Sequence, residues 1–178
     1  MTLMAEKSAT PMRAIRVDKV IINIGTGASD EHAASAKKLI ELVTKAKPTY
    51  ALARKRIPTF KIAKGTKIGA FVTVRGPRAK ELAQKLFTAV DNRVKPSSVT
   101  NNTVNFGIHE YIDISGIKYD PSIGMMGMNV NVSFRRPGLR TELKKRASGK
   151  VKRSHRTIGR AELVEYLSRE FKVEVAGA

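Results

Sequence analysis

The chain contains no cysteine and no tryptophan, and only 4 tyrosines and 6 phenylalanines among its 178 residues. The lack of cysteine excludes disulfides, cysteine-ligated zinc and iron–sulfur clusters, and it is compatible with a reducing cytoplasm. No apolar run is long enough for a transmembrane helix or a secretory signal, so nothing in the sequence directs export. Because aromatic side chains are few, base stacking cannot dominate a nucleic-acid contact, and phosphate and shape contacts are favoured.

Acidic residues are also scarce, since 15 Asp and Glu stand against 34 Lys and Arg, for a net charge of +19. This imbalance exceeds what solubility requires, and it destabilises the compact state by self-repulsion. A nucleic acid is the simplest partner that would compensate for it. An anionic membrane surface is the weaker alternative, because no clean basic amphipathic helix with Trp or Phe on its apolar face is present. We therefore expect no membrane partner.

Signals for catalysis are weak. Gly25-Thr26-Gly27 follows an expected strand, but Asp30 stands where a dinucleotide-binding fingerprint needs a third glycine. The chain has no Gly-Lys-Ser/Thr sequence and no Gly-x-Ser-x-Gly elbow. Its histidines, His32, His109 and His155, are scattered, so a metal site would need long-range convergence. We therefore expect no enzymatic activity, no cofactor, no metal and no small-molecule substrate.

Hydrophobic periodicity predicts an α+β fold. Runs of β-branched or alternating apolar residues predict strands at 15–24, 49–53, 69–75, 104–108, 111–114, 129–135 and 173–175. Apolar residues at helical spacing predict helices that begin after Ser29, begin at Gly76-Pro77, and run from 160 to 171. We expect a mostly antiparallel sheet with helices packed on one face, a long basic loop and a basic C-terminal extension. The other face would be free for a ligand and would carry Asn23, Thr73 and Arg75.

The length suits a single domain across residues 1–178. Within it we expect a flexible N-terminus at 1–12, an α+β nucleic-acid-binding core at 13–138, and a basic segment followed by a C-terminal helix at 139–178. We find no internal repeat.

The stretch 54–67, which we call the basic loop, carries six cations and no acidic residue. Like charges this close repel one another, so the folded monomer gains nothing from holding them together without an external polyanion. Pro58 and Gly65 punctuate the loop, and apolar side chains between the cations can anchor a docked partner. A solvated, mobile loop is the alternative reading of such a charge run. The candidate contact residues are Arg54, Lys55, Arg56, Phe60, Lys61, Lys64 and Lys67.

A second basic tract follows the last long strand. Between residues 135 and 160, eleven cations stand against one acid, Glu142. Alone this tract would be disordered, and it would order on an anion. A nuclear localisation signal is the alternative for Lys144-Lys145-Arg146. The candidate RNA contacts are Arg135, Arg136, Arg140, Lys144, Lys145, Arg146, Lys150, Lys152, Arg153 and Arg156.

The order of several short motifs resembles the large-subunit ribosomal protein five family, whose members bind 5S ribosomal RNA. The matching stretches are 19–27 (KVIINIGTG), 47–48 (KP), 53–69 (ARKRIPTFKIAKGTKIG), 72–76 (VTVRG), 105–108 (NFGI), 117–121 (IKYDP) and 127–130 (GMNV). They occur in order over most of the expected core and are highly specific. The basic sequence that begins at Arg135-Arg136-Pro137-Gly138 resembles the archaeal and eukaryotic branch of the family rather than the bacterial one.

The resemblance implies a structural protein of the cytoplasmic ribosome, in the central protuberance of the large subunit. In that family the sheet and nearby loops hold 5S ribosomal RNA, which implies contacts from Asn23, Lys47, Thr73 and Arg75. It further implies that the basic loop faces peptidyl-site transfer RNA, and that the half at 105–130 helps to bridge to a small-subunit protein in the head. Large-subunit ribosomal RNA and a neighbouring 5S-associated ribosomal protein would be additional partners. The chain departs from the family at Lys45-Ala46, where Gly-Gln is common, so the corresponding Gln amide is missing.

Two other classes of function stay open. A basic, chromatin-like DNA-binding protein would bind duplex DNA and 5S ribosomal RNA with similar affinity at matched salt, whereas a ribosomal protein would prefer the folded RNA. A small RNA-modifying enzyme would need turnover that no residue here accounts for. The ordered motifs favour the ribosomal protein.

Overall fold

A six-stranded sheet forms the centre of the computed structural model, which describes residues 11–146 and 148–175. Its strand order is β2-β3-β1-β7-β6-β5, and each neighbouring pair is antiparallel. The strands are β1 (Arg16–Gly25), β2 (Thr49–Leu52), β3 (Lys67–Arg75), β5 (Val99–Thr100), β6 (Thr103–Ile108) and β7 (Met128–Arg135). A small parallel sheet pairs β4 (Arg93–Val94) with β8 (Glu174–Val175). The expected α+β fold is confirmed, and most of the expected flexible N-terminus lies outside the described residues.

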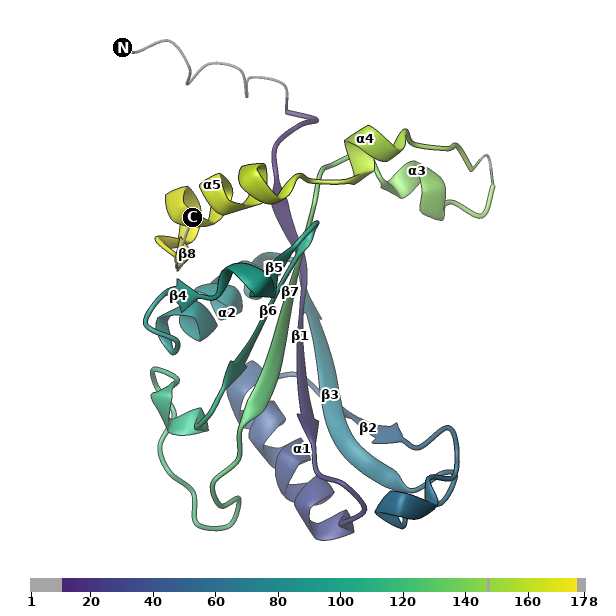
Figure 1. Ribbon diagram of the computed structural model, residues 1–178, viewed down its shortest axis with the longest axis vertical. Helices are drawn as coiled ribbons and strands as arrows, with labels where there is room; N and C mark the ends of the chain where they lie inside the picture. The colour runs from purple at the N-terminus through teal and green to yellow at the C-terminus, as the bar shows by residue number, and fades with distance from the viewer. Residues whose placement is uncertain (1–10, 147, 176–178) are drawn as a thin grey trace.

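Helices α1 and α2 lie on one face of the large sheet (Figure 1). α1 (Asp30–Thr44) begins where the Ser29 hydroxyl accepts a hydrogen bond from the His32 N–H, as expected of this cap. α2 (Pro77–Thr88) begins with a proline, which suits the first turn because that N–H has no helical partner. α5 (Arg160–Phe171) has the bounds that the sequence predicts. None of the helices in the described ranges is long and apolar enough to cross a membrane.

One hydrophobic core joins the sheet to these helices. Val20, Ile22 and Ile24 alternate along β1 and point toward the helices, and β3 and β7 follow the same alternation. Leu163 and Leu167 of α5 are fully buried in the same core. Each large side chain buried in this way stabilises the fold by about 1.5–3 kcal/mol. The side chains buried between sheet and helices lie on one sheet face, and the opposite face carries mostly polar side chains.

Residues 111–114 differ from the expected strand, because Tyr111–Asp113 forms a 3₁₀ turn. Tyr111 and Ile114 are the buried residues of this segment, and a spacing of three suits a helical turn rather than a strand. The Tyr111 hydroxyl also accepts a hydrogen bond from the Asp120 N–H at 3.0 Å. The alternation of apolar residues in this segment was therefore misleading, and the prediction of a strand here is wrong.

The basic segment at 139–156, which we call the basic arm, contains two short helices, α3 (Arg140–Leu143) and α4 (Arg153–Arg156). It extends away from the sheet beyond β7 (Figure 1). The expectation that its order depends on a bound anion stays a prediction. Its root is tied to the domain by Asn102, whose side chain donates to the Arg156 carbonyl and accepts from the Ile158 N–H, both at 2.8 Å.

Candidate nucleic-acid interface

The sheet face opposite α1 and α2, which we call the open face, presents three rows of side chains across neighbouring strands. Residues directly opposite each other in an antiparallel pair point to the same face, so the register defines these rows. From β6 to β3, the rows are Thr103, Ser133, Lys19 and Arg75; Asn105, Asn131, Ile21 and Thr73; and Gly107, Asn129, Asn23 and Phe71. The expected placement of Asn23, Thr73 and Arg75 on one free face is confirmed.

Amide and hydroxyl side chains on the open face are linked to one another. The Asn131 amide donates a hydrogen bond to Asn105, and the Ser133 hydroxyl donates to the Asn131 side-chain oxygen at 3.2 Å. Side chains held by such bonds lose less freedom when a ligand binds, because part of the ordering has already occurred. Amides and hydroxyls can hydrogen-bond both phosphate oxygens and the 2′-hydroxyl groups exposed in the shallow groove of RNA.

Cations gather at the end of the open face where β1 begins. The register places Lys19 opposite Arg75 and Arg16 opposite Arg135. The Asp18 carboxylate lies among them, 3.0 Å from Arg135 Nε and 3.8 Å from Arg75 Nη1. Arg135, which the sequence grouped with the second basic tract, is thus part of the sheet surface.

The basic loop is a hairpin with exposed side chains. Its base is closed by backbone hydrogen bonds from the Ala53 N–H to Thr66 and from the Gly65 N–H to Ala53, both 2.9 Å. Five of its cations, Arg54, Lys55, Arg56, Lys61 and Lys64, are exposed and form no ion pair with any described residue. The side chain of Phe60 is 70% exposed between them. An exposed ring among unpaired cations suits a nucleic acid, which offers both phosphates and stacking faces.

Lys67 differs from the other cations of the loop. It is the first residue of β3, its Nζ lies 3.4 Å from Asp30 Oδ1, and it also lies over the Tyr50 ring. The expectation that no carboxylate is near the cations of this stretch is therefore wrong for Lys67, because the fold brings the first turn of α1 beside it.

The second basic tract, 135–160, also divides into cations with partners among the described residues and cations without them. Arg136 Nη2 donates to Glu162 Oε1 at 2.8 Å, and the Arg136 side chain is only 12% exposed. Arg156 lies 3.6 Å from Glu142, which also accepts a hydrogen bond from the Val151 N–H. These contacts hold the arm in place rather than present charge. The exposed cations for which the described residues provide no ion pair are Arg140, Lys144, Lys145, Arg146, Lys150, Lys152 and Arg153.

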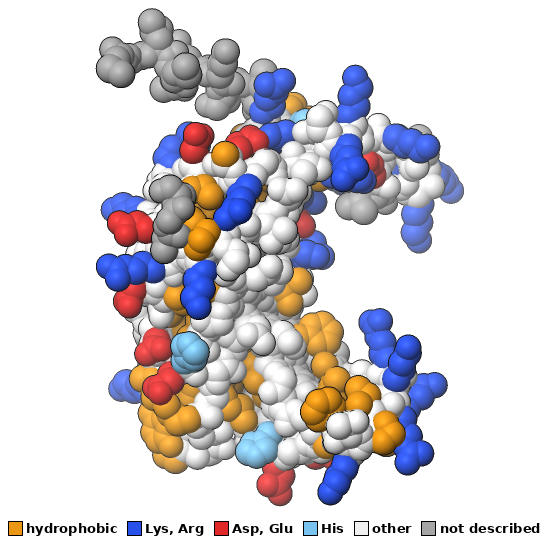
Figure 2. Space-filling view, in the orientation of Figure 1, with side chains coloured by type: hydrophobic (Ala, Val, Ile, Leu, Met, Phe, Trp, Pro, Cys, Tyr) orange, Lys and Arg blue, Asp and Glu red, His pale blue; other side chains and the backbone are white. Residues whose placement is uncertain are grey.

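Figure 2 shows that the molecular surface is hollowed between the basic arm and the basic loop, with Lys and Arg side chains gathered at both ends. A groove of about 740 Å³ lies on the open face, lined by Asn23, Asn105, Asn129 and Asn131 together with Arg93 and Lys95. Apolar residues, among them Ile21, Val90 and Phe106, line the rest of this groove, so the open face offers a groove of mixed polar and apolar lining with cations beside it. Such a surface fits an irregular polyanion better than a small substrate.

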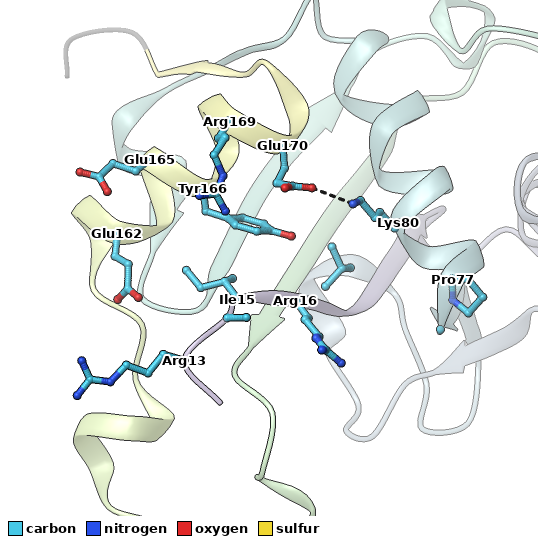
Figure 3. Close-up of a pocket in the computed structure, with 13 residues that line it drawn as sticks. Arg13, Ile15, Arg16, Pro77, Lys80, Glu162, Glu165, Tyr166, Arg169 and Glu170 are labelled. Carbon is cyan, nitrogen blue, oxygen red and sulfur yellow. Dashed lines mark hydrogen bonds and ion pairs between the residues drawn. The ribbon is translucent and has the colours of Figure 1, made fainter. Parts of the chain in front are cut away.

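A second hollow, of about 630 Å³, lies between the start of β1, the start of α2 and α5 (Figure 3). Lys80 Nζ donates a hydrogen bond to Glu170 Oε2 at 2.8 Å, which lowers the pKa of Glu170 and raises that of Lys80. Burial raises the pKa of Tyr166 beside them. Charges of both signs line this hollow, and its closest pair is already hydrogen-bonded, so it does not present a uniformly cationic surface.

The structure brings together three of the four residues expected to hold 5S ribosomal RNA. Asn23, Thr73 and Arg75 share the open face, and Lys47 is exposed two residues before the edge strand β2. Sequence patterns did not single out Asn105, Asn129 and Asn131 as contacts. The alternation in 129–135 could have indicated the two outward asparagines of β7, whereas Asn105 needed the β6–β7 register.

Comparisons with known proteins place the chain among ribosomal protein sequences. Residues 67–166 match the family described as the C-terminus of the ribosomal L5 family, and residues 10–62 match Ribosomal protein L5. The chain is 39% identical to the large ribosomal subunit protein uL5 of Sulfurisphaera tokodaii, over 97% of this chain and 98% of that protein. It is 40% identical to uL5 of Nanoarchaeum equitans, over 93% of this chain and 98% of that protein. With uL5 of Nitrosopumilus maritimus it shares 38% identity, over 97% of this chain and all of that protein.

The fold and the open face, with its amide rows and cationic ends, define a nucleic-acid-binding protein. The matches cover nearly the whole chain, and the relatives are archaeal, in agreement with the resemblance noted in the sequence. The chain belongs to the ribosomal protein L5 family.

Proposed function

We propose that this protein is a structural constituent of the large subunit of the cytoplasmic ribosome, where it binds 5S ribosomal RNA through the open face. The observation that carries the proposal is the register of β6, β7, β1 and β3, which aligns asparagines, hydroxyls and cations in rows on one uncovered face. Phosphate contacts position an RNA, and amides and hydroxyls can read its 2′-hydroxyls and groove shape. The protein has no catalytic role in this proposal.

The basic loop serves a second RNA in the proposal, the peptidyl-site transfer RNA. Its exposed cations lie at the end of the hollow away from the basic arm (Figure 2), and the side chain of its Phe60 is 70% exposed. The arm, with its own exposed cations, contacts large-subunit ribosomal RNA. A polyanion on either segment would relieve the repulsion among cations that form no ion pair with any described residue.

The half at 105–130 faces proteins in the proposal, as part of a bridge to the small-subunit head. Its exposed apolar side chains, Ile112, Tyr119 and Met125, are 40–52% exposed, and Leu42 of α1 adds another at 52%. Apolar surface without excess positive charge suits a protein neighbour better than RNA. A neighbouring 5S-associated ribosomal protein completes the proposed set of partners.

A competition binding assay tests the central claim. The purified protein is titrated against 5S ribosomal RNA, an unrelated structured RNA of equal length, and duplex DNA, each at several salt concentrations. We expect a preference for 5S ribosomal RNA that persists as the salt concentration rises. Hydrogen bonds to sugar hydroxyls and a fit to the folded RNA are less screened by salt than phosphate contacts are. Equal binding to all three that collapses together with salt would overturn the proposal and favour a chromatin-like DNA-binding protein.

A further inference from the structure

Asp18 is a carboxylate in the middle of a surface built for a polyanion. Acidic residues weaken phosphate binding, so its position calls for a physical reason. Its side chain is only 18% exposed, and the Oδ1 atom is buried without a hydrogen bond from any described group. An oxygen buried in this way is costly unless nearby charges compensate for it.

A β-bulge places Asp18 on the open face. Val17 pairs with Phe134 and Lys19 pairs with Ser133, so two steps along β1 correspond to one step along β7, and Asp18 is the extra residue. Strict alternation would turn a residue next to Lys19 toward the helices. The bulge instead re-aims the side chain, a common use of bulges beside functional surfaces.

Two arginines compensate for the buried oxygen. Arg135 Nε lies 3.0 Å from Asp18 Oδ1, and Arg75 Nη1 lies 3.8 Å from the same atom. The Arg75 and Arg135 side chains stay 62% and 45% exposed. Because Arg135 meets the carboxylate through Nε, its two terminal nitrogens stay available to a ligand.

Without Asp18, the described residues would provide no ion-pair partner for Arg75 or Arg135. Lys19 lies opposite Arg75 and Arg16 lies opposite Arg135, and like-charged pairs across strands repel one another. The long side chains would then spread into solvent in many conformations. A shared carboxylate draws the two guanidinium groups to one point and fixes their separation.

We propose that Asp18 is a positioning residue, which holds Arg75 and Arg135 as a paired guanidinium site for phosphate groups of the bound RNA. This inference rests on the proposed function. It assigns a role in RNA specificity to an acidic side chain, which by its charge alone would weaken RNA binding. Planar, fixed guanidinium groups bind a phosphate with two parallel hydrogen bonds, whereas a mobile arginine contributes mainly charge.

The test compares Asp18→Asn with wild-type protein for binding to 5S ribosomal RNA and to an unrelated structured RNA at matched salt. The substitution raises the net charge by one, so charge alone predicts equal or tighter binding to both RNAs. We expect equal or tighter binding to the unrelated RNA but weaker binding to 5S ribosomal RNA, so that the preference falls about tenfold. Glu81→Gln on the exposed side of α2 removes the same charge away from the open face and should leave the preference unchanged.

A double-mutant cycle separates positioning from mere structure. In an Arg75→Ala, Arg135→Ala background, Asp18→Asn should have no further effect on the preference, because the groups it positions are absent. Arg135→Lys keeps the charge but removes the planar fork, and should lower the preference, whereas Arg78→Lys, at an exposed position of α2 away from the open face, should not. This pair of lysine variants tests the inference even if Asp18→Asn does not fold.

The outcomes are distinct. A wild-type protein without a 5S preference overturns the proposed function, and the paired site falls with it. A wild-type preference that survives both Asp18→Asn and Arg135→Lys overturns the positioning role alone. Additive effects in the double-mutant cycle would also overturn it.

Discussion

The open face and the basic loop both offer cations to a polyanion, but they hold them in different ways. On the sheet, register fixes the positions of Lys19, Arg75 and Arg135, and Asp18 pairs with two of them. In the loop, Arg54 to Arg56 are exposed and have no ion pair within the described chain. Fixed cations can select the shape of an RNA, whereas loosely held cations add attraction of little selectivity.

The two regions meet where β3 leaves the loop, and the largest expected effect lies there. Gly69 of β3 faces Gly25 of β1, and a Cβ on Gly69 would overlap the Ile24 carbonyl oxygen. Gly69→Ala should therefore separate β3 from β1 and lower the free energy of unfolding by about 2–3 kcal/mol. Gly25→Ala is the matched control, because a Cβ there meets nothing within 4 Å. Urea denaturation checks both, and equal stabilities would contradict this account of the β1–β3 register.

The comparison itself is tested by one substitution in each region. Arg75→Ala should weaken binding to 5S ribosomal RNA by about 1–3 kcal/mol, because a positioned guanidinium can make two hydrogen bonds to one phosphate or base. Lys64→Ala removes the same charge from the loop and should leave that affinity almost unchanged. Filter binding or fluorescence anisotropy measures both. Equal losses of affinity in the two variants would show that the sheet and the loop contribute alike to binding 5S ribosomal RNA.

Neighbouring arginines at the end of β7 sharpen the contrast between binding and structure. Arg136 is paired with Glu162 and nearly buried, whereas Arg135 is about half exposed. Arg136→Ala should lower the free energy of unfolding by about 1–2 kcal/mol, since it leaves Glu162 without its partner and releases the basic arm. Arg135→Ala should cost less stability but more RNA affinity. Thermal unfolding and RNA binding are measured for both variants. If Arg135→Ala lost more stability and Arg136→Ala lost more RNA affinity, the structural role of Arg136 and the binding role of Arg135 would be contradicted.

The smallest expected effect lies away from both regions, in the Lys80–Glu170 pair. The hydrogen bond from Lys80 lowers the pKa of Glu170 below its ordinary value of 4.5, so the pair stabilises the protein above that pH. This contribution, about 0.5 kcal/mol for an exposed pair, is lost as the pH falls through the lowered pKa. Glu170→Gln should thus be less stable than wild type at pH 7 and closer to it in acid. An unchanged difference across this pH range would count against the pair.

Local sequence patterns were sufficient for most of the fold. The alternating β-branched residues in 15–24 and 129–135 lie on one side of the chain only if the segment is a strand. The apolar residues in 160–171 lie on one side only if the segment is a helix. The pattern failed at 111–114, where Ile112 and Ile114 alternate as in a strand, but the buried residues are Tyr111 and Ile114, three apart as in a turn. The short pairing of β4 with β8 joins segments about 80 residues apart, which no local pattern can indicate.

The sequence by itself determined the net charge, the alternation that turns Asn23, Thr73 and Arg75 outward, and the location of the basic loop. These properties depend only on residue type and on periodicity along one strand. Only the tertiary structure decided which outward residues become neighbours, because strand order and register join β6, β7, β1 and β3 into shared rows. It also decided that Arg136 is a structural contact and that a bulge turns Asp18 toward two arginines. Pairing between strands depends on the packing of the whole core, and the sequence of one strand does not indicate which strand it pairs with.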